Sequence, residues 1–141
     1  MSYVHSLNDG ERASANQLIR RLASNGVILK GYDPMAYFIQ KKAVKGSSKC
    51  QSAYQGATYY FSSAADLAIF QSNPSKYVPQ YGGFCANGVK NNRLKDSDPT
   101  VFFIIKGKMY ICESPAGEKE FRSNKDEDIV TANRNWLQMQ H

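Results

Sequence analysis

The chain has 141 residues, of which 42% are hydrophobic and 21% are charged, and its formal net charge is +6 at pH 7. This length and composition are typical of one folded domain that needs neither a metal ion nor a disulfide merely to fold. No apolar run approaches the roughly 18 residues of a spanning helix, so no membrane span is expected.

The N-terminal region predicts a helix without a targeting signal. Ala15, Leu18 and Leu22 share one face of a helix over residues 10–24. We therefore assign residues 1–30 to an N-terminal helical extension and residues 31–141 to the remaining domain. Because MSYVHSLNDGERASANQ lacks the apolar core of a signal peptide, we expect a cytoplasmic protein if Met1 is native, or an exported one if a signal has been removed.

A short turn and a β-hairpin are predicted next. Asp33 and Pro34 can begin a helical turn, with the proline at the first helical position. An aspartate in this position more often caps the turn that follows it than binds a ligand. The stretch Ser52–Phe61 predicts two strands joined by a turn at Gly56.

A helix follows the hairpin. Ser63 and Asp66 have the spacing of a capping box, and the helix that they open ends before Asn73-Pro74. We expect this helix to pack against the hairpin through three apolar side chains, those of Tyr60, Leu67 and Phe70.

The C-terminal third predicts a second hairpin and two helices. Residues 101–105 and 109–112 are apolar and are separated by Lys106-Gly107, while Ser114-Pro115 begins a helix. The acidic run 126–128 suits the start of the last helix through the helix dipole, although an acidic run can also attract a cation. One face of that helix is expected to carry Ile129, Val130, Asn133, Trp136 and Leu137. The fold class is therefore α+β.

A basic patch raises the question of nucleic acid. It consists of Lys41, Lys42, Lys45 and Lys49, and three aromatic residues lie nearby in sequence, namely Tyr37, Phe38 and Tyr54. Cations for phosphates and rings for stacking are what a nucleic-acid site needs. No recognised motif accompanies the charge, so a solvated loop is the favoured interpretation.

Histidine and cysteine usage narrows the chemistry. The two histidines, His5 and His141, lie at the chain ends, which disfavours hydrolases that need an imidazole beside a nucleophile. Cys50, Cys85 and Cys112 are odd in number and far apart, unlike the close ligand pairs of zinc sites or a disulfide framework. By default such thiols are small core residues.

Several motifs resemble the bacterial stand-alone YHS-domain proteins. They are GYDPMAYF, YYFSSAADLAIFQSNPSKY and QYGGFCANGV, and the likeness runs from about Gly31 to Leu137. The resemblance implies a compact hairpin-and-helix unit with a second hairpin. In the wider family it also implies metal binding through cysteines in a DPVCGM-like turn and a YYFCSxxC junction.

The cysteines of that family site are missing from this chain. The three corresponding positions hold Ala36, Ser62 and Asp66. An alanine cannot ligate, a serine hydroxyl is a poor ligand for soft metals, and the aspartate is expected to accept backbone N–H groups at the helix start. No cofactor is therefore predicted, and the domain is interpreted as a retained scaffold.

Cys85 remains the candidate for thiol chemistry. A small side chain beside Gly82 and Gly83 suits close packing, whereas a thiol at the start of a helical turn can be a reactive thiolate. Tyr81, Phe84 and Asn87 are predicted to line a pocket around it. Asp33 and Tyr37, four residues apart on one side of a turn, are further candidate pocket residues that could hydrogen-bond a ligand.

We therefore expect a non-enzymatic binding or accessory module for a small ligand or a protein partner. The alternatives left open are a thiol-dependent redox protein and a protein that handles a metal ion through Cys85.

Overall fold

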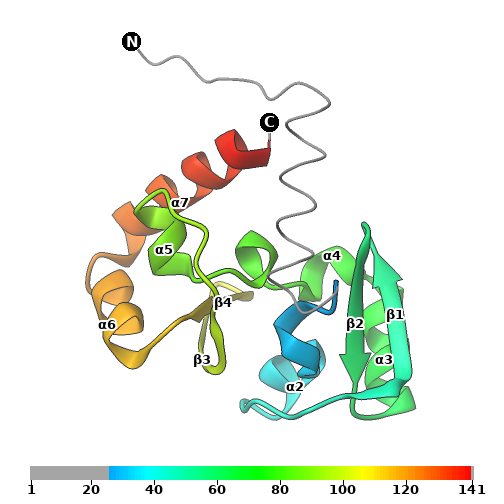
Figure 1. The fold of residues 1–141 in the computed structure, drawn as a ribbon. Coiled ribbons are helices and arrows are strands. Elements are labelled where there is room, and N and C mark those ends of the chain that lie inside the picture. Colours follow the sequence, from blue (N-terminus) through cyan, green and yellow to red (C-terminus); the bar gives the residue numbers. More distant parts are fainter. Residues whose placement is uncertain (1–25, 141) are drawn as a thin grey trace.

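The computed structural model describes residues 26–140 of the chain. The helix predicted at residues 10–24, together with His5 and His141, lies outside these residues. The described part contains helices and two separate two-stranded antiparallel sheets, which confirms the predicted α+β class (Figure 1).

The elements follow one another with short connections. In the first half they are η1 (Ile28–Gly31), α2 (Pro34–Ile39), β1 (Ser47–Tyr54), β2 (Ala57–Phe61), α3 (Ala64–Ser72) and α4 (Pro74–Tyr77). In the second half they are η2 (Gln80–Gly83), α5 (Ala86–Lys90), β3 (Asp98–Ile105), β4 (Lys108–Cys112), α6 (Pro115–Ser123) and α7 (Lys125–Gln140). Figure 1 shows β1, β2, α2 and α3 on one side of the molecule and α5, α6 and α7 on the other.

The first hairpin packs against α3, but one of its predicted contacts is wrong. Phe70 is fully buried, and its ring centroid lies 5.0 Å from those of both Tyr59 and Phe61. Tyr60 instead faces the other side of β2, where its ring lies close to Gly31. Successive side chains alternate across a strand, so Tyr59 and Phe61 reach the helix and the residue between them cannot.

The second hairpin separates two hydrophobic cores. From β4, Met109 and Ile111 join the core that contains α3, whereas Tyr110 and Cys112 join the core beneath α5, α6 and α7. All four side chains are buried. The continuous apolar run of this strand therefore reflects burial on both faces, and the alternation directs Cys112 toward the C-terminal helices.

The last helix buries a narrower face than its sequence predicts. Ala132 is fully buried, and Ile129 and Trp136 pack against the C-terminal core. Val130 and Leu137, which were expected on the same face, are 60% and 52% exposed. Ala132 lies one turn before Asn135, whose amide donates to the carbonyls of Val89 and Lys90 in α5, so this face of the helix meets α5.

The glycine pair before Cys85 has a backbone role. Tyr81, Gly82 and Gly83 have φ values of 59°, 62° and 84°, so three successive residues adopt the left-handed conformation. A Cβ at Gly83 would face Ile28 and Pro79 rather than Cys85. The pair therefore reverses the chain direction before Cys85 instead of providing space around its sulfur.

Candidate thiol site

Cys85 lies immediately before α5 and is held by the backbone on both sides. Its N–H donates to the carbonyl of Lys95 at 3.0 Å, and its carbonyl accepts from the N–H of Val89 at 3.0 Å. The second contact is the first hydrogen bond of the helix, so the Cys85 side chain stands at the point where the helical N–H groups are free. Only 3% of the residue is exposed.

A second thiol approaches Cys85 from β4. The N–H of Glu113 donates to the Sγ atom of Cys85 at 3.2 Å, and Glu113 directly follows Cys112 in the chain. The α-carbon of Cys112 is about 2.4 Å from that nitrogen by covalent geometry, so it lies within roughly 6 Å of the Cys85 sulfur. Both cysteines belong to the same core.

The pKa values of the two thiols are shifted in opposite directions. A hydrogen bond from the Cys112 side chain lowers the pKa of Cys85 to about 6, and the backbone N–H groups of Gly88, Glu113 and Asn87 lower it further against the opposing effect of burial. The pKa of Cys112 is raised because its proton is shared with Cys85 and because the group is buried. The pair therefore holds one proton near neutral pH, with the negative charge on Cys85.

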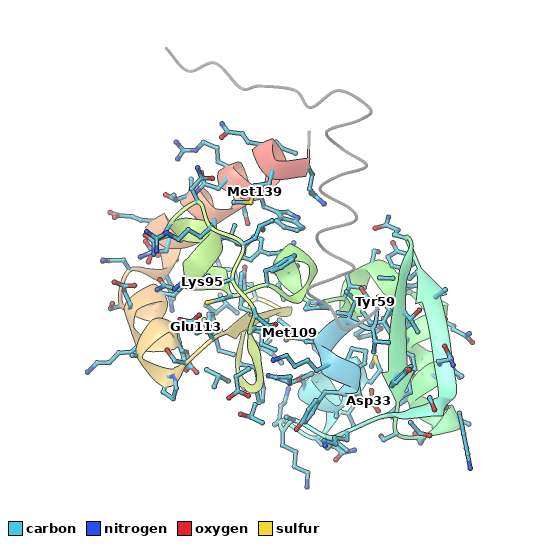
Figure 2. The ribbon with its side chains drawn as sticks, viewed as in Figure 1. Asp33, Tyr59, Lys95, Met109, Glu113 and Met139 are labelled. Atoms are coloured by element: carbon cyan, nitrogen blue, oxygen red, sulfur yellow. The ribbon has the colours of Figure 1, made fainter. Side chains whose placement is uncertain are left out.

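A cavity of about 330 Å³ adjoins Cys85. It is lined by Cys85, Asn87, Gly88, Asn91, Arg93, Lys95, Glu113 and Gly117. The charged side chains at this opening are exposed, and Lys95 Nζ lies 3.4 Å from Glu113 Oε1. Figure 2 shows Lys95 and Glu113 on the side of the molecule opposite Asp33.

Asn87 contributes a polar atom to this cavity. Its amide nitrogen donates to Glu120, but its Oδ1 atom is buried without a hydrogen-bond partner among the described residues. A buried acceptor without a donor costs about 1–3 kcal/mol.

The predicted pocket residues do not form one pocket. Asn87 lies beside Cys85, whereas Tyr81 lines a separate cavity of about 650 Å³ and donates to Asn133 Oδ1 at 2.8 Å. Phe84 is buried against Trp136. Asp33 and Tyr37 are fully buried in the part of the molecule that contains α2.

Asp33 links the turn that holds Ala36 to the segment that holds Ser62 and Asp66. Its Oδ1 atom accepts from the N–H of Met35 at 2.8 Å, as expected for a cap of α2. Its Oδ2 atom accepts from the N–H and the hydroxyl of Ser62 at 2.8 and 2.6 Å. One carboxylate thus joins the turn before α2 to the junction between β2 and α3.

Asp66 interacts with this cluster rather than with the helix backbone. Ser63 Oγ accepts from the N–H of Asp66 at 3.1 Å, but the reciprocal half of the predicted capping box is absent, and the Asp66 carboxyl lies 3.4 Å from Ser62 Oγ. A hydrogen bond with the Asp33 carboxyl raises the pKa of Asp66 to about 6, with burial adding to the effect. The Asp66 carboxyl is therefore more readily protonated than an ordinary aspartate in mildly acidic solution.

The aromatic rings near the basic patch are buried or half-buried. Its four lysines are exposed, but Tyr37 is fully buried and donates its hydroxyl proton to the carbonyl of Pro99 at 2.7 Å. Phe38 and Tyr54 pack against the first core.

Comparison with known families identifies the central segment. Residues 35–81 match the model of the YHS domain. The chain contains a YHS domain. No match was found among curated proteins or among solved structures. The matched segment runs from α2 into η2, so Cys85 and Cys112 lie beyond the segment that defines the YHS domain.

Two further observations concern the described residues alone. Residues 26–140 contain no group of three or more His, Cys, Asp or Glu side chains arranged to hold a metal ion. No helix in the same part of the chain is long and apolar enough to cross a membrane.

Proposed function

We propose that the protein is a YHS-domain module that acts through a reactive thiolate at Cys85. The observation that carries the proposal is the donor set around the Cys85 sulfur, which includes the Glu113 N–H at 3.2 Å and the Cys112 thiol. Donors of this kind stabilise the thiolate, which is the nucleophilic form of cysteine. The adjoining cavity gives a small reactant a position beside the sulfur.

The proposal includes the loss of the family's metal site. The residues present do not fit a metal ion, because Ala36 has no ligating atom and both Asp33 oxygens already accept hydrogen bonds. A hydroxyl such as that of Ser62 is a poor ligand for the soft metals that thiolates bind. On this proposal, the Asp33 carboxylate replaces the metal as the link between the α2 turn and the β2–α3 junction.

A second candidate is a non-enzymatic binding module in which Cys85 only packs. The observation that favours it is the 3% exposure of Cys85 within the C-terminal core. In that case the cavity would hold a small ligand beside Arg93 and Lys95, with no reaction at sulfur.

Alkylation of the folded protein distinguishes the two candidates. The protein is treated with iodoacetamide across a range of pH, and the labelled cysteines are identified by peptide mapping. A reactive thiolate predicts labelling of Cys85 with a midpoint near its pKa of about 6, while Cys112 stays protected. Labelling of Cys85 only after urea unfolding would reject the thiolate proposal and leave the binding module. Cys50, which is half-buried on β1, serves as the internal comparison.

A further inference from the structure

We infer that Cys85 and Cys112 form a peroxidatic and resolving pair that reduces a small hydroperoxide and closes a reversible disulfide between the second hairpin and α5. This inference rests on the proposed thiolate function and adds its substrate class and its second residue. The matched YHS segment contains neither cysteine.

The geometry allows the bridge to form without a change of fold. The contact between Glu113 N–H and the Cys85 sulfur brings the Cys112 α-carbon to within roughly 6 Å of that sulfur, and the Cys112 thiol hydrogen-bonds to the same sulfur. A short movement of the two side chains then brings the sulfurs to the bond length of about 2.05 Å. Cys112 ends β4 and Cys85 begins α5, so both stand at the ends of elements, where small backbone adjustments are least costly.

The cavity favours a small oxidant over a protein disulfide. Cys85 is 3% exposed, and the adjoining space of about 330 Å³ accommodates a small molecule but not the disulfide loop of a folded partner. Arg93 and Lys95 line the same cavity and place positive charge near the leaving oxygen, although Glu113, whose Oε1 lies 3.4 Å from Lys95 Nζ, offsets part of it.

The first step transfers one oxygen to sulfur. The Cys85 thiolate attacks the outer oxygen of the hydroperoxide, the S–O bond forms as the O–O bond breaks, and the leaving alkoxide takes a proton from water to become the alcohol. Cys85 is then a sulfenic acid. Its negative charge has gone, which removes the charge repulsion that helps to hold the proton on Cys112.

The second step closes the disulfide. The Cys112 sulfur attacks the Cys85 sulfur, the S–S bond forms as the S–O bond breaks, and the departing hydroxide takes the Cys112 proton and leaves as water. In sum, one thiolate and one thiol lose two electrons, and one hydroperoxide is reduced to an alcohol and a hydroxide ion, which the solvent neutralises. A small thiol in solution reopens the bridge by thiol–disulfide exchange.

The test treats the reduced full chain with one equivalent of cumene hydroperoxide, followed by alkylation and peptide mapping. We expect a Cys85–Cys112 cross-linked peptide in the wild type and in the matched control Cys50→Ser, with Cys50 remaining alkylated. Cys112→Ser should stop at the sulfenic acid on Cys85, which dimedone traps. Cys85→Ser should slow peroxide consumption by about tenfold or more.

Several outcomes would overturn the inference. Wild-type protein that consumes hydroperoxide without the cross-link refutes the resolving role of Cys112, and faster closure with oxidised glutathione refutes the substrate class. If Cys85 is alkylated with a midpoint near pH 6 but no bridge forms, this inference fails and the thiolate function stands. If Cys85 resists alkylation in the folded protein, both fail. The wild-type measurements do not depend on whether any variant folds.

Discussion

Replacing Cys112 by alanine should raise the pKa of Cys85, because the Cys112 thiol is the largest single cause of its low value. A hydrogen bond to a charged group contributes about 1.5–3 kcal/mol, and one pKa unit corresponds to about 1.4 kcal/mol. A thiol is a weak donor, so the lower end of that range applies. We therefore expect Cys112→Ala to move the Cys85 pKa from about 6 to roughly 7.

Cys112→Ser provides the matched control, since a hydroxyl of similar size keeps a donor in the same place. The Cys85 pKa should stay close to its wild-type value in that variant. The assay is the pH dependence of Cys85 alkylation in a Cys50→Ser background. The midpoint is the quantity to compare, because a thiolate of lower pKa is also intrinsically less nucleophilic and the two effects partly cancel in the rate.

The outcome that refutes this reasoning is a Cys85 midpoint that is the same in Cys112→Ala as in the wild type. Equal shifts in the alanine and serine variants would also refute it, because they would assign the effect to packing rather than to the donor. Thermal unfolding of both variants checks the fold. Cys112 is fully buried, and removal of its sulfur is expected to cost about 1 kcal/mol.

Three further predictions concern the rest of the fold. The pKa of Asp66 is raised from 3.8 to about 6 in the folded protein. Its contribution to the stability of the fold is therefore fully present below the pKa of the unfolded chain and is lost as the pH rises through 6. The free energy of unfolding in urea should fall by on the order of 1 kcal/mol as the pH rises through this range, and Asp66→Asn should not show this fall. Wild-type and Asp66→Asn stabilities that follow the same pH dependence would contradict the prediction. Gly46→Ala should lower the free energy of unfolding by about 3 kcal/mol, because its Cβ would lie 2.6 Å from the β2 backbone. Gly83→Ala, at a φ of +84°, should lower it by about 1 kcal/mol. Equal melting temperatures for the two variants would count against this prediction. Protein purified without chelators should contain no stoichiometric zinc or copper by elemental analysis, and metal that is lost in Asp66→Ala would overturn the proposed loss of the family site.

The elements were predictable because their signals are local. Asp33, Ser63 and Ser114 accept hydrogen bonds from backbone N–H groups at the helix starts, as their positions immediately before the predicted helices indicate. Both hairpins turn at the expected Gly56 and Lys106-Gly107 positions. Capping and turn chemistry depend on residues close in sequence, so one sequence is enough to find them.

The wrong or missing predictions concern contacts between segments that are far apart in the sequence. Tyr60 was assigned to the wrong face of β2, because the sequence does not reveal which face α3 covers. The partner of Cys85 was missed for a related reason. A signal for it existed in the alternation of β4, which places Cys112 with Tyr110, but only the fold shows that this face meets α5.

The same alternation explains why the thiol site and the YHS segment can differ in role within one small protein. Met109 and Ile111 of β4 complete the core of the YHS segment, while Cys112 on the opposite face supports Cys85. A disulfide at Cys112 would therefore constrain a strand that both cores share. On the inference made above, oxidation of the thiol pair should stiffen β4 and slow hydrogen exchange at Met109 and Ile111, although the side chains of both belong to the core on the opposite face of the strand. If hydrogen exchange slows only around Cys85, the effect of oxidation is confined to the C-terminal core. The second hairpin would then not transmit it to the other half of the protein.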